Sequence, residues 1–68
     1  MIAFEVNDMT CGHCASTITR AVQELDPQAK LQIDLAKHRV DIDSALADAA
    51  QLSHAITEAG YTPVPVNP

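Results

Sequence analysis

The chain of 68 residues contains no tryptophan, and Phe4 and Tyr61 are its only aromatic residues. Branched aliphatic side chains and alanine must therefore form most of the core. No stretch approaches the roughly 20 apolar residues that a membrane-spanning helix needs. Met1 leads directly into a strand pattern, without the charged and apolar regions of a signal peptide. We therefore expect a cytoplasmic protein without a membrane span.

Basic residues are also scarce: four lysines and arginines stand against nine acidic residues, and the net charge is −5. Nucleic acids and anionic membranes attract basic surfaces, so the sequence predicts neither as a partner. The composition is otherwise that of an ordinary globular protein, without repeats or low-complexity segments. We predict a single domain over residues 1–68 with one small core.

Apolar spacing predicts a strand, a helix and a hairpin in the first two thirds of the chain. Residues 2–6 alternate between apolar and polar side chains, which indicates a strand with one buried face. An apolar stripe over 15–25 predicts a helix, which ends at Asp26 because a proline follows. Alternation over 31–35 and again over 40–42 predicts two strands joined by a short turn.

A second helix and a final strand complete the pattern. Asp43 or Ser44 can cap this helix, Leu46 opens its apolar side, and Gly60 ends it. The last strand, 61–66, contains two prolines and must lie at a sheet edge. The order βαββαβ predicts an α+β fold. We expect a ferredoxin-like sandwich, with a four-stranded antiparallel sheet, central first and third strands, and both helices on one face.

The only two cysteines lie in Met9-Thr10-Cys11-Gly12-His13-Cys14, where the first strand gives way to the helix. Free N–H groups and the positive end of the helix dipole favour thiolates there. Two thiolates are too few for a structural zinc site, which typically takes four protein ligands. They suit Cu(I), a soft ion that accepts low coordination by sulfur. Because such a site leaves room for an incoming thiolate, it favours metal transfer over storage.

The sequence Cys-Gly-His-Cys is also the active-site tetrapeptide of protein disulfide isomerases. Thioredoxin-like domains need about 100 residues, and a tryptophan usually precedes their motif. This chain is shorter, lacks tryptophan and has a different predicted order of elements. A small thiol-disulfide oxidoreductase is therefore the alternative from another functional class, and the favoured interpretation is a protein that is not an enzyme.

Two segments resemble the signatures of the heavy-metal-associated domain family. Residues 9–14 resemble its M-x-C-x-x-C motif, and residues 55–61, Ala-Ile-Thr-Glu-Ala-Gly-Tyr, resemble its second signature. The family comprises copper chaperones, mercury carriers and N-terminal domains of heavy-metal-transporting P-type ATPases, all with a ferredoxin-like fold. The resemblance implies that Cys11 and Cys14 are the metal ligands.

The residues around this motif favour copper among the family's metals. Thr10 stands where zinc- and cadmium-directed members often have aspartate, which would add a hard oxygen ligand. Gly60-Tyr61 resembles the bacterial copper chaperones, whose tyrosine packs beside the site. Asp8 departs from the family pattern, because many members have glycine there.

Several neighbours of the cysteines invite a functional interpretation. We expect Met9 to be a core anchor rather than a thioether ligand, since methionine readily fills irregular gaps. We expect His13 to point to solvent and to tune the sulfurs or contact a partner, rather than to act as a third ligand. Tyr61 is expected to screen the site or to donate a hydrogen bond to sulfur. His38 and His54 are predicted to be exposed.

We therefore predict a Cu(I) metallochaperone that carries one ion on Cys11 and Cys14. It would transfer the ion by ligand exchange to the metal-binding domain of a copper-transporting P-type ATPase. The alternatives within the binding class are an N-terminal domain of such an ATPase and a mercury or zinc carrier. A copper-bridged homodimer also stays open, because two open thiol pairs could share an ion.

Overall fold

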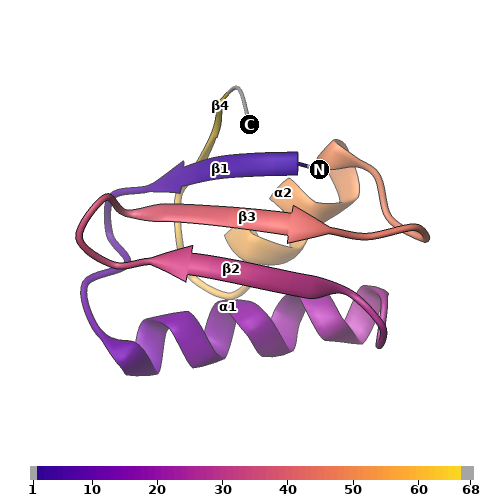
Figure 1. The fold of residues 1–68 in the computed structure, drawn as a ribbon, viewed down its shortest axis with the longest axis horizontal. Helices are drawn as coiled ribbons and strands as arrows, with labels where there is room; N and C mark the ends of the chain where they lie inside the picture. The colour runs from indigo at the N-terminus through magenta and orange to yellow at the C-terminus, as the bar shows by residue number, and fades with distance from the viewer. Residues whose placement is uncertain (1, 67–68) are drawn as a thin grey trace.

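The computed structural model describes residues 2–66, so both ends of the predicted domain lie outside it. The predicted order of strands and helices is confirmed (Figure 1). The elements are β1 (Ile2–Val6), α1 (Gly12–Leu25), β2 (Lys30–Asp34), β3 (Arg39–Asp43), α2 (Ala49–Glu58) and β4 (Pro63–Val66). Neither helix of this described part has the length and apolar character to cross a membrane.

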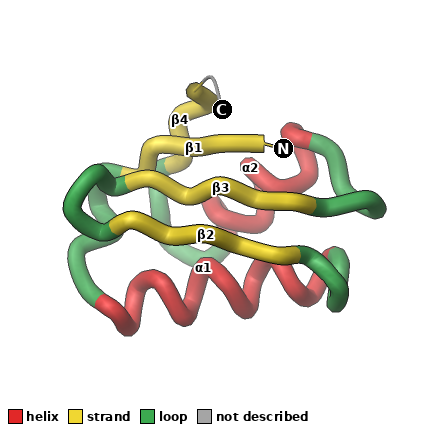
Figure 2. Tube along the Cα trace, in the orientation of Figure 1, coloured by secondary structure: helices red, strands yellow, loops and turns green. Residues whose placement is uncertain are grey.

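The four strands form one antiparallel sheet in the order β2-β3-β1-β4, with β1 and β3 central as predicted (Figure 2). β4 pairs only with β1 and therefore lies at an edge. Its residues Pro63 and Pro65 stand opposite Val6 and Phe4. An edge tolerates prolines because their missing N–H groups can face away from the ladder.

Both helices pack on one face of the sheet and enclose a single core (Figure 1). Each helix contributes two fully buried aliphatic side chains, one turn apart, so that one stripe faces the strands. The fully buried core residues of the helices and strands are Ile18, Val22, Leu52, Ile56, Phe4, Val6, Val40 and Ile42. The core is thus formed mainly by aliphatic side chains, with Phe4 as its one fully buried aromatic residue among those described.

α2 begins later than the sequence predicted. The predicted caps Asp43 and Ser44 are wrong, because α2 starts at Ala49 with Asp48 as its N-cap. The Asp48 carboxylate accepts a hydrogen bond from the Gln51 backbone N–H at 2.8 Å, and Gln51 Oε1 accepts one from the Asp48 N–H at 3.1 Å. This reciprocal arrangement is a capping box, which satisfies two backbone donors at the helix start.

Ser44 is occupied elsewhere. Its hydroxyl donates to Asp26 Oδ2 at 2.7 Å and accepts from the Ala47 N–H at 3.2 Å. This bond from Ser44, followed by one from the Gln28 backbone, lowers the pKa of the buried Asp26 carboxyl. Leu46 precedes the helix and is 72% exposed, so its predicted place on the apolar face is wrong.

Replacing Asp48 with alanine is expected to lower the free energy of unfolding by about 1 kcal/mol, because the N-cap bond is lost. Urea denaturation followed by circular dichroism measures this change. Asp43→Ala is the matched control, since Asp43 is exposed and caps no helix, and it should change stability by less than about 0.5 kcal/mol. Equal effects of the two substitutions would contradict the capping role of Asp48.

Candidate metal centre

The two cysteines converge at the N-terminus of α1. Cys11 is the N-cap residue with an extended backbone, and Cys14 lies in the first helical turn. Their sulfurs are 3.4 Å apart, and both are free thiols rather than a disulfide. Cys11 is exposed and Cys14 is half-buried, so one side of the pair faces solvent. The loop therefore offers two soft donors at one point, open to an incoming group.

Tyr61 lies against the half-buried cysteine. Hydrogen bonds from the Tyr61 hydroxyl, the Thr10 backbone and the Cys11 thiol together lower the pKa of Cys14 to about 7. The bond with Cys14 also raises the pKa of Tyr61, because the phenol loses its donor when it ionises. The Tyr61 hydroxyl lowers the pKa of Cys14 more than the backbone groups near the helix start do. These bonds thus favour the thiolate form of Cys14.

Two polar contacts tie the cysteine loop to distant parts of the chain. The Asp8 carboxylate accepts hydrogen bonds from the backbone N–H and the hydroxyl of Thr62, both at 3.1 Å. His38 Nδ1 lies 3.0 Å from the Met9 carbonyl oxygen. His38 is therefore half-buried and bonded, and the prediction that it is exposed is wrong. Neither contact carries a local sequence signal, because its partners are 54 and 29 residues apart.

The remaining predicted neighbours take separate places. The Met9 side chain is fully buried in the core, as expected of an anchor. His13 is exposed, and His54 is exposed on α2, 3.4 Å from Glu58. Within residues 2–66, no three His, Cys, Asp or Glu side chains gather in a way that could hold a metal. Among the described residues, Cys11 and Cys14 are therefore the candidate metal ligands, and the exposed His13 forms no such cluster with them.

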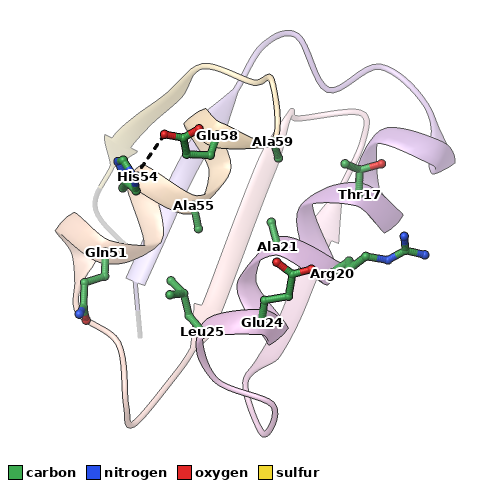
Figure 3. A pocket seen from close by; sticks show the side chains of 10 residues that line it. All are labelled: Thr17, Arg20, Ala21, Glu24, Leu25, Gln51, His54, Ala55, Glu58 and Ala59. Carbon is green, nitrogen blue, oxygen red and sulfur yellow. Dashed lines mark ion pairs between the residues drawn. The ribbon is translucent and has the colours of Figure 1, made fainter.

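A separate groove of about 410 Å³ runs between the two helices (Figure 3). Small apolar side chains form much of it, and acidic and basic groups from both helices surround them. Its lining residues are Thr17, Arg20, Ala21, Glu24, Leu25, Gln51, His54, Ala55, Glu58 and Ala59. It contains neither cysteine, and its mixed charges define no ligand, so the cysteine loop is the candidate site.

Replacing Tyr61 with phenylalanine is expected to raise the pKa of Cys14 from about 7 toward the ordinary value of 9.0, because the largest stabilising hydrogen bond is removed. The thiolate fraction at pH 7 then falls, since a higher pKa favours the protonated form. Titration of the Cys14 ¹³Cβ chemical shift measures the change. Thr57→Ala, which removes a hydroxyl bonded only within α2, should leave the Cys14 midpoint in place. An unchanged midpoint in the phenylalanine variant would contradict the role of the phenol.

The fold and the site together define a class: small ferredoxin-like domains that carry two converging thiols on a surface loop at the start of the first helix. Residues 3–62 match the heavy-metal-associated domain family. The chain belongs to this family, and the match includes both cysteines and Tyr61.

Relatives with similar sequences carry copper-related names. The chain is 39% identical over 61 residues to the COP-associated protein of Helicobacter felis, covering 88% of this chain and 92% of the relative. It is 35% identical over 60 residues to the copper chaperone CopZ of Enterococcus hirae, covering 85% and 87%. It is also 33% identical over 58 residues to the copper-transporting ATPase HMA5 of rice, covering 82% of this chain and 6% of the ATPase.

Solved structures agree with the fold. The copper chaperone Atx1 from Synechocystis PCC6803 superposes with a TM-score of 0.89 at 42% identity, covering 94% of this chain and all of the other. A gold binding protein superposes with the same TM-score at 36% identity, covering 97% of this chain and all of the other.

Proposed function

We propose that this protein is a Cu(I) metallochaperone that binds one ion between Cys11 and Cys14. The observation that carries the proposal is the distance of 3.4 Å between the two sulfurs. A metal–sulfur bond is about 2.3 Å long for zinc, so two sulfurs on one ion can lie up to about 4.6 Å apart. The pair is therefore within the span of a single ion. Two thiolates without a hard oxygen ligand favour Cu(I) over Zn(II).

The exposed side of the site allows the ion to be passed on by ligand exchange. A partner's thiolate approaches beside Cys11 and bonds to the ion, which then has three sulfur ligands. Cys11 leaves, a second thiolate of the partner binds in its place, and Cys14 then leaves, so the ion ends on two thiolates of the partner. No covalent bond of a substrate is made or broken, so the proposed protein is a carrier rather than an enzyme. Exchange between sulfur ligands also requires no full release of the ion into water.

We propose the metal-binding domain of a copper-transporting P-type ATPase as the acceptor. The likeness to a short stretch of the rice ATPase supports this, because a partner with the same two-thiolate site can exchange ligands step by step. The same likeness supports the alternative that the chain is itself such a domain. Either assignment places the transfer in the cytoplasm, where thiols stay reduced. We also propose that two copies of the chain can share one ion between their open pairs of cysteines, as a copper-bridged homodimer.

The test is a titration with Cu(I) under anaerobic, reducing conditions against a competing chromophoric chelator. The expected result is one Cu(I) per chain, with Zn(II) unable to displace it. Copper-loaded protein mixed with an apo ATPase metal-binding domain should then transfer its ion, which separation of the two proteins and metal analysis would quantify. Failure to retain Cu(I) would reject the proposal. Catalysed reduction of insulin disulfides by dithiothreitol would instead support the oxidoreductase alternative.

A further inference from the structure

The turn between β2 and β3 lies beside the cysteine loop, at the end of the sheet where β1 stops (Figures 1 and 2). Three hydrogen bonds close a ring between the two segments. The Val6 N–H donates to the His38 carbonyl at 2.7 Å, the Met9 N–H donates to the Val6 carbonyl at 3.1 Å, and the His38 ring reaches the Met9 carbonyl at 3.0 Å. His38 thus contacts both ends of the tight turn that leads into the cysteine loop.

The histidine side chain must be the donor in this contact. A carbonyl oxygen only accepts hydrogen bonds, so His38 Nδ1 carries the hydrogen that Met9 binds. The contact is therefore a hydrogen bond from the imidazole N–H to the Met9 carbonyl.

The backbone of His38 adopts φ = +54°, the left-handed region that non-glycine residues seldom occupy. Glycine would occupy this conformation without strain, but it has no side chain to reach the Met9 carbonyl. The histidine therefore adds a hydrogen bond at a position where the backbone alone would favour glycine.

Met9 is consequently held from two sides. Its side chain is fully buried in the core, and its carbonyl is bound by His38. Cys11 follows two residues later, and its own carbonyl accepts the first helical hydrogen bond from Ala15 at 3.2 Å. The segment between these anchors is short, so the position of Met9 determines where the Cys11 sulfur can lie relative to Cys14.

We propose that His38 is a positioning residue of the metal centre, which clasps the Met9 carbonyl and holds Cys11 in place for Cu(I). Its effect on copper rests on the proposed function, whereas its effect on the loop does not. Without the clasp the loop gains conformations in which the two sulfurs diverge, so the binding-competent state is less populated and the apparent affinity falls.

Three substitutions separate the side-chain donor from the backbone conformation. His38→Asn keeps an N–H donor at the place of Nδ1 and tolerates the left-handed region. His38→Asp has the same shape and tolerance, but its ionised carboxylate only accepts hydrogen bonds. His38→Gly removes the side chain, relieves the backbone and adds no charge. Each variant is measured by Cu(I) competition, by urea denaturation, and by hydrogen exchange of the Val6 and Met9 amides.

The expected loss of Cu(I) affinity is about three- to tenfold for both Asp and Gly, with affinity retained for Asn. Exchange of the Met9 amide should accelerate by a similar factor in the same two variants. The glycine variant should unfold at an unchanged or higher urea concentration while its affinity falls. A residue that only stabilised the fold would not lower the Cu(I) affinity while the stability stays unchanged or rises.

Each contrary outcome has a separate meaning. Equal Cu(I) affinity in all four proteins, or equal Met9 amide exchange, would overturn the role of His38. A loss confined to the aspartate variant would also overturn it, because added charge would then explain the effect. If the wild-type protein fails to bind Cu(I), the proposed function is rejected. The exchange measurements on the apo proteins still decide whether the clasp holds the loop.

Discussion

Replacement of both Cys11 and Cys14 with serine is expected to abolish competitive binding of Cu(I). Serine has nearly the same shape as cysteine, but its hydroxyl is neutral near pH 7 and is a hard oxygen donor. Cys11 and Cys14 are soft ligands whose sulfurs meet at this loop. The variant should therefore show no copper uptake against the chelator that the wild-type protein outcompetes.

Single substitutions sharpen this result. Cys11→Ser and Cys14→Ser should each lose most of the affinity, because one remaining thiolate cannot hold the ion between two sulfurs. Ser16→Ala is the control, since Ser16 is exposed, lies two residues beyond Cys14 and contributes no sulfur. Circular dichroism should show the same fold in all variants, as Cys11 is exposed and Cys14 is only half-buried. Full copper affinity in the double variant would reject the two-thiolate site.

Replacement of Met9 with alanine is expected to lower the free energy of unfolding by about 2–5 kcal/mol, because Met9 is fully buried and a cavity replaces its side chain. A domain of this size has a total stability of about 3–10 kcal/mol, so the variant loses a large fraction of it. Urea denaturation measures the loss. Leu46→Ala is the control, since Leu46 is 72% exposed, and it should change stability by less than about 0.5 kcal/mol.

Met9→Leu then distinguishes an anchor from a ligand. Leucine conserves most of the volume, so this variant should stay within about 1.5 kcal/mol of the wild-type stability. It lacks sulfur, and its Cu(I) affinity should nevertheless equal that of the wild-type protein. A fall in copper affinity without a fall in stability would assign the thioether to the metal. A small stability loss in Met9→Ala would contradict the anchor role.

The fold was predictable because local patterns and topology agreed. Alternation identified the strands, and the prolines of β4 fitted only an edge. The start of α2 was missed because Asp43 and Ser44 are as good capping residues as Asp48 by type. Asp48 differs in having Gln51 three residues later, which completes a capping box. Ser44 bonds to Asp26 instead. Sequence spacing contains no trace of such a bond across 18 residues.

The convergence of the two cysteines and the bond from Tyr61 to Cys14 were also predictable, whereas the polar contacts that hold the loop were not. The motif and the helix start bring Cys11 and Cys14 together through neighbouring residues. The partners of the loop, Thr62 and His38, reach it only after the sheet has formed. A turn between strands is normally exposed, which is why the sequence predicts an exposed His38. In the structure its side chain instead contacts the Met9 carbonyl.

The prolines of β4 also bear on how this molecule meets others. N–H groups on alternate residues of a strand point to the same side, and Pro63 and Pro65 occupy alternate positions. Val64 and Val66 can donate toward β1, so the outer rim of β4 presents carbonyl oxygens without N–H donors. Such a rim cannot template the growth of a continuous sheet with a second chain. Two copies, or this protein and a domain of similar fold, can therefore touch through their loops and separate again without locking edge to edge along β4.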